Sequence, residues 1–120
     1  MNPFHWLFGG RSVRSSVLSM YKRGLAKAEK HDRQGALEAY TAAIELQDAP
    51  EDVRAMALYN RALVFAAAGE TTKAVADLQA LLAIPVPLRE IKSAARRRLD
   101  RMHRQHDAGI TARPNTRAST

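Results

Sequence analysis

The fold is decided by residues 55–85, which read AMALYNRALVFAAAGETTKAVADLQALLAIP. Apolar residues recur in this stretch at three- and four-residue steps, first over residues 55–65 and then over residues 74–82. This spacing predicts two amphipathic helices, because strands would alternate apolar and polar residues at every second position. Gly69 lies between the two segments, and glycine readily adopts the left-handed conformation that ends a helix. The stretch therefore predicts a helical hairpin.

The same pattern occurs earlier in the chain, displaced by one constant offset. At this offset identical or similar side chains align: Tyr21 with Tyr59, Arg23 with Arg61, Leu25 with Leu63, Ala28 with Ala66, Ala36 with Ala74 and Ile44 with Leu82. Similarity at one fixed offset is typical of a repeat architecture. After Pro85 and Pro87 a fifth helix is expected, with apolar residues on one side and arginines on the other. A last helix of this kind commonly covers the exposed end of a stack of repeats.

Each hairpin resembles a tetratricopeptide repeat, a helix pair of about 34 residues with small residues where the helices touch. The resemblance spans roughly residues 17–103, as two repeats plus a C-terminal capping helix. Small residues stand at the matching positions: Gly24, Ala36, Ala62 and Ala74. The first unit departs from the family pattern at Lys27, where an aromatic residue is usual, and at His31, where glycine is usual. The resemblance implies an all-α fold, a right-handed α-α superhelix.

The resemblance also implies a function, that of a non-catalytic adaptor for protein–protein interaction. In this family the first helix of each unit lines a concave groove that holds a peptide or a partner helix. The matching groove positions are Leu18, Tyr21, Leu25, Met56, Tyr59, Asn60 and Leu63. On the capping helix, Arg89, Lys92 and Arg96 are expected to contact anionic groups. The expected partner is a protein or peptide with hydrophobic anchors and acidic flanks.

The sequence contains no recognisable catalytic motif. There is no cysteine, the four histidines are scattered, and no glycine-rich phosphate loop follows a strand. His103 and His106 share a predicted helix, but two imidazoles without a third ligand make a poor zinc site. We therefore expect no enzyme activity, no cofactor and no metal.

The net charge of +7 is unevenly distributed. Residues 1–30 carry +5, residues 31–88 carry −4 and residues 89–120 carry +6. Such asymmetry favours an anionic partner. The alternative function is therefore binding of nucleic acid (RNA) or of an anionic surface through the basic C-terminal helix, although the stacking aromatic residues of RNA-binding modules are missing from it.

The two ends of the chain differ from its middle, so we divide it into an apolar N-terminal arm (1–14), a helical domain (15–105) and a disordered basic tail (106–120). The arm carries Phe4, Trp6, Leu7 and Phe8, which need a surface to cover them. The expected surface is the groove of the same chain, the groove of a second copy in a homodimer, the first helix or a membrane interface. The apolar run is too short for a secretory signal or a membrane span, so we expect a cytoplasmic protein.

Overall fold

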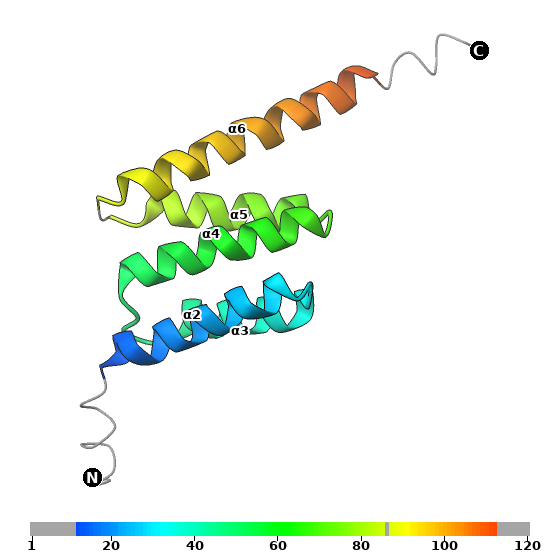
Figure 1. The fold of residues 1–120 in the computed structure, drawn as a ribbon. Coiled ribbons are helices and arrows are strands. Elements are labelled where there is room, and N and C mark those ends of the chain that lie inside the picture. Colours follow the sequence, from blue (N-terminus) through cyan, green and yellow to red (C-terminus); the bar gives the residue numbers. More distant parts are fainter. Residues whose placement is uncertain (1–11, 86, 113–120) are drawn as a thin grey trace, which may run out of the picture.

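The computed structural model describes residues 12–85 and 87–112, and these residues form five helices without a strand (Figure 1). The helices are α2 (Val13–Glu29), α3 (Arg33–Glu45), α4 (Glu51–Ala67), α5 (Thr71–Ala83) and α6 (Arg89–Ala112). Helix α3 pairs with α2, and α5 pairs with α4, so the chain forms two hairpins followed by one long helix. The prediction of an all-α fold is confirmed.

The helix boundaries follow the internal repeat of the sequence. Helices α2 and α4 each have 17 residues, and α3 and α5 each have 13. Each helix of the second hairpin follows its counterpart in the first at the offset that separates Tyr21 from Tyr59. Helix α6 begins at the same offset after α4, so it occupies the place of the first helix of a third hairpin.

The turn inside each hairpin has the same hydrogen bonds. After α2, the amides of His31 and Asp32 donate to the carbonyls of Ala28 and Lys27, at 3.0 and 2.9 Å. After α4, the amides of Gly69 and Glu70 donate in the same way to the carbonyls at the equivalent places, Ala66 and Phe65, at 3.1 and 2.8 Å. This pair of bonds is the Schellman motif, which requires a left-handed residue just after the helix. Gly69 has φ +79°, and His31 has φ +60°.

Exchanging the residues of the two turns tests this equivalence. His31→Gly is expected to stabilise the fold by about 0.5–1 kcal/mol, because a residue with a Cβ is strained in the left-handed region. Gly69→His is expected to destabilise it by a similar amount. Urea denaturation of both variants measures the two changes. Shifts of the same sign would show that the two turns are not equivalent.

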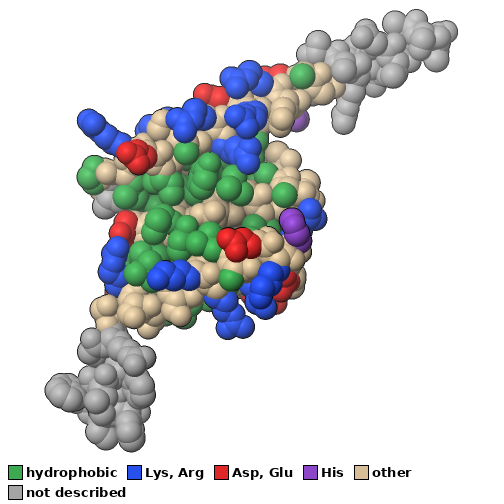
Figure 2. Space-filling model, viewed as in Figure 1, with side chains coloured by type: hydrophobic (Ala, Val, Ile, Leu, Met, Phe, Trp, Pro, Cys, Tyr) green, Lys and Arg blue, Asp and Glu red, His purple; other side chains and the backbone are tan. Residues whose placement is uncertain are grey.

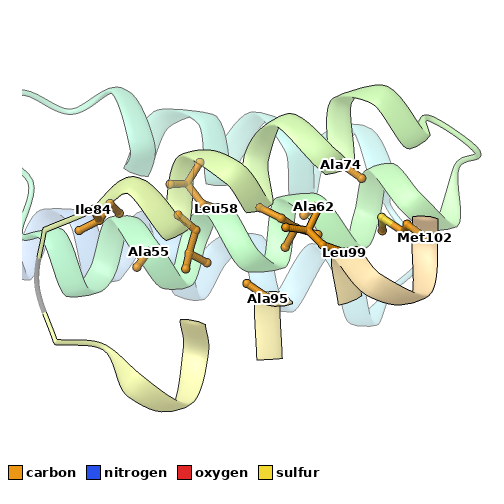
Figure 3. Close-up of a cluster of buried hydrophobic side chains, with 10 residues drawn as sticks. Ala55, Leu58, Ala62, Ala74, Ile84, Ala95, Leu99 and Met102 are labelled. Carbon is orange, nitrogen blue, oxygen red and sulfur yellow. The ribbon is translucent and has the colours of Figure 1, made fainter. Parts of the chain in front are cut away.

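The core is built from two clusters that share α4. The first joins α2 and α3 to α4, with Val17, Tyr40 and Val53 among its fully buried side chains. The second joins α4, α5 and α6, and it includes Leu58, Leu99 and several alanines (Figure 3). Alanines let the helix backbones approach closely, so the helices stack into a layered array with a cluster of buried side chains on each side of α4.

The segment boundaries differ from those expected at both ends. Val13 and Arg14, assigned to the arm, belong to α2, whose N-cap is Ser12. Helix α6 continues to Ala112, although residues 106–112 were assigned to a disordered tail. Their polar composition suggested a tail, but residues 102–112 contain no proline, and α6 runs through Gly109. Residues 1–11 and 113–120, which hold the rest of the arm and tail, lie outside the described residues.

Candidate functional site

Helices α2, α4 and α6 lie side by side along one face of the stack (Figure 1). Two contacts set the register of α2 and α4: Arg14 binds the Asp52 carboxylate with two hydrogen bonds of 2.8 and 3.1 Å, and the Asn60 amide donates to the Tyr21 hydroxyl at 3.0 Å. On this face, apolar side chains form a band between α6 and α2, with Lys and Arg side chains along both flanks (Figure 2). We call this band the groove.

Two cavities open along the groove. The distal cavity, of about 680 Å³, lies between α2 and the C-terminal half of α4, and Leu25, Leu63 and Val64 line it together with Glu29 and His31. The proximal cavity, of about 410 Å³, lies where α4 and α6 begin; its lining residues are Asp52, Met56, Pro87, Leu88, Arg89, Glu90 and Ile91. The structure thus places Leu25, Asn60 and Leu63, all predicted groove residues, around one cavity, and Met56 in the other.

The remaining predicted groove residues are partly used in packing. Tyr21 is half-buried; its ring centroid lies 6.0 Å from that of Tyr40, and burial raises the pKa of its hydroxyl. Leu18 packs on the same core cluster as Tyr21, and Tyr59 packs on the cluster between α4 and α6. The Asn60 amide donates to the Tyr21 hydroxyl, which joins α4 to α2, and to the Met56 carbonyl within α4.

Tyr40 connects the core to the distal cavity, because it lines that cavity while its side chain is only 1% exposed. Burial, with a smaller contribution from Tyr21, raises the pKa of Tyr40 to about 12 from 10.0. In the unfolded chain the Tyr40 hydroxyl ionises around pH 10, whereas in the folded chain it keeps its proton at that pH. The contribution of Tyr40 to the free energy of unfolding should therefore be fully present below pH 10. The free energy of unfolding should then decrease by about 3 kcal/mol as the pH rises to about 12.

Urea denaturation from neutral to alkaline pH measures this decrease. In Tyr40→Phe, which cannot ionise at this position, the decrease should be smaller by that amount. An identical pH dependence in the variant and the wild type would contradict the assignment to Tyr40.

The three predicted anionic contacts on α6 lie in different surroundings. Lys92 stands one repeat after Arg54, and both side chains donate to carbonyls at the end of the preceding helix, Lys92 to Ile84 and Arg54 to Ile44. The Lys92 ammonium is therefore engaged in joining α6 to α5. Arg96 stands one repeat after Leu58, is exposed and lines neither groove cavity. Of the three, only Arg89 lines a groove cavity.

Two other arginines of α6 correspond, through the repeat, to residues that line the distal cavity. Arg98 and Arg101 stand one repeat after Asn60 and Leu63, which line the distal cavity. Arg101 is exposed, and Arg98 is half-buried with its Nε buried and without a hydrogen-bond partner. Extending the repeat offset into the last helix would have identified both residues from the sequence.

None of the helices described here is long and apolar enough to cross a membrane. In residues 12–85 and 87–112, no three His, Asp or Glu side chains gather where they could hold a metal ion. No family model matches the sequence, and searches of curated proteins and of solved structures give no match either.

Proposed function

We propose that this protein is a tetratricopeptide-like, non-catalytic adaptor of the cytoplasm that binds a peptide or a partner helix in its groove. The observation that carries the proposal is the position of Leu63. This leucine is half-buried and lines the distal cavity, yet it belongs to neither core cluster. A large apolar side chain that lines a cavity and takes no part in the core is available to a ligand.

The charges around the groove favour a ligand with apolar anchors and acidic residues. Leu25 and Leu63 offer apolar contact area in the distal cavity, and Arg98 and Arg101 provide positive charge on α6. The buried Nε of Arg98 lacks an acceptor, and a carboxylate from a ligand would supply one. The preferred ligand therefore places an acidic residue toward α6 and its apolar side chains toward α2 and α4.

A peptide selected against the protein tests the proposal. Peptides displayed on phage are selected on the wild-type chain, and the dissociation constant of a synthetic copy is measured by calorimetry. Leu63→Ala should weaken binding about tenfold or more, because it removes apolar area from the binding surface. Leu37→Ala is the matched control: Leu37 is also half-buried and outside both clusters, and it lines neither groove cavity.

Charge reversal separates the contributions of the two sides of the groove. Arg101→Glu should weaken an acidic peptide and leave an uncharged analogue unaffected. Binding that is insensitive to Leu63→Ala would contradict the proposed groove.

Binding of RNA is the second candidate, and the exposed arginines of α6 favour it. Arg97, Arg101 and Arg104 are exposed and recur at three- and four-residue steps along the helix. Affinity for single-stranded RNA should then fall steeply as the salt concentration rises. RNA affinity that is equal in Arg97→Ala and the wild type would argue against it.

A further inference from the structure

The proximal cavity lies close to the point where the chain enters α2. Asp52 lines this cavity and also binds Arg14, in the first turn of α2. Ser12, the N-cap of α2, is two residues before Arg14. The segment that precedes Ser12 therefore starts beside the rim of the proximal cavity.

The segment of residues 1–11 is long enough to reach across the proximal cavity. An extended chain covers about 3.3 Å per residue, and packed helices lie about 8–10 Å apart. Phe8, four residues before Ser12, can reach about 13 Å, as far as α4. Trp6 can reach about 20 Å, the distance from α2 across α4 to α6. Gly9 and Gly10 lie between these residues and α2, and glycines permit the chain reversal that such a path needs.

The chemistry of the segment and of the cavity is complementary. Four of the five residues from 4 to 8 are large and apolar, namely Phe4, Trp6, Leu7 and Phe8. The cavity presents Met56, Leu88 and Ile91. Residues 1–11 contain Arg11 and no acidic residue, and the cavity lining holds the carboxylates of Asp52 and Glu90 beside the guanidinium of Arg89. An aromatic segment thus precedes a helix that begins close to an apolar cavity.

We propose that residues 4–8 dock in the proximal cavity of their own chain, with the Trp6 indole between α4 and α6. Docking within one chain is favoured over exchange between two chains because a short flexible tether gives an effective concentration in the millimolar range. The docked segment covers aromatic side chains that would otherwise promote aggregation. It leaves the distal cavity open, so it does not depend on the proposed peptide binding there.

Trp6 is the single tryptophan of the sequence, so its fluorescence in the full chain reports the environment of the segment directly. In the wild type we expect blue-shifted emission and weak quenching by acrylamide. Met56→Glu places a charge in the proximal cavity and should shift the emission to the red, with quenching several-fold stronger. Met20→Glu is the matched control, since Met20 is also half-buried but lines a different cavity between α2 and α3. Circular dichroism checks that both variants keep their helices.

Glu90→Lys provides a second test at an exposed residue, where unfolding is not expected. It should increase the quenching of Trp6, because the basic segment then meets a positive charge. A wild-type Trp6 that acrylamide quenches as readily as free tryptophan would overturn the proposal. So would protection of Trp6 that disappears on dilution together with a dimer, because that result assigns the docking to a second copy.

Discussion

Replacing Asp77 with alanine is expected to destabilise the fold by about 3 kcal/mol. The Asp77 carboxylate is buried, at 5% exposure, and accepts hydrogen bonds from Nε and Nη2 of Arg61 at 2.8 and 2.7 Å. Arg61 Nη1 also donates to the Thr41 hydroxyl at 3.0 Å, so one network joins α5, α4 and α3. The bonds to Asp77 raise the pKa of Arg61 and keep it charged. Without the carboxylate, a largely buried guanidinium loses its counter-charge.

Asp52→Ala is the matched control for this prediction. Asp52 is also bound by an arginine through two hydrogen bonds, but the side chains of Arg14 and Asp52 are 51% and 41% exposed, against 18% and 7% for Arg61 and Asp77. Water solvates the exposed Arg14 and Asp52 side chains in both the folded and the unfolded chain. Loss of this ion pair should therefore lower the stability much less. Urea denaturation compares the two variants, and equal losses of stability would contradict the role given to burial.

The second large effect is expected for Gly24→Ala in α2. A Cβ at this position would lie 3.0 Å from Cζ of Tyr40 and closer still to Cε1 and Cδ1. The Tyr40 ring is buried and cannot move aside without disturbing the core. We expect a net loss of about 2 kcal/mol, because overpacking outweighs the gain of about 1 kcal/mol in helix propensity.

Gly109→Ala makes the same substitution in α6, where nothing lies within 4 Å of the added Cβ. It should leave the stability unchanged or raise it by up to about 1 kcal/mol. Thermal or urea denaturation of both variants shows the signs of the two changes. A stabilising Gly24→Ala would mean that α2 and α3 are packed less closely than the structure indicates.

The repeat made the fold predictable from the sequence. Apolar periodicity located all five helices, and the offset between Tyr21 and Tyr59 gave the register in which α2 and α4 lie side by side. His31 was noted as a departure from glycine, and its backbone is left-handed, as at Gly69. These features depend on neighbouring residues or on a fixed offset, which a sequence displays directly.

The side of α6 that faces the groove was less predictable. Basic residues cover the whole of this helix except its apolar side, so composition could not separate those facing the groove from those facing away. Lys92 was expected to contact a ligand, but it binds the Ile84 carbonyl at the end of α5. Tyr59 was expected in the groove, and it packs on the core cluster of α4, α5 and α6.

The sequence by itself determined that the chain forms two equivalent helical hairpins and a capping helix, because helix periodicity and repeat spacing are properties of the chain alone. The tertiary structure decided which side chains the stack buries. Asp77 became a buried partner of Arg61, while Leu63 was left lining a cavity outside the core. The physical reason is that burial depends on the rotation and tilt of each helix against its neighbours. That geometry arises when the two hairpins and α6 pack together.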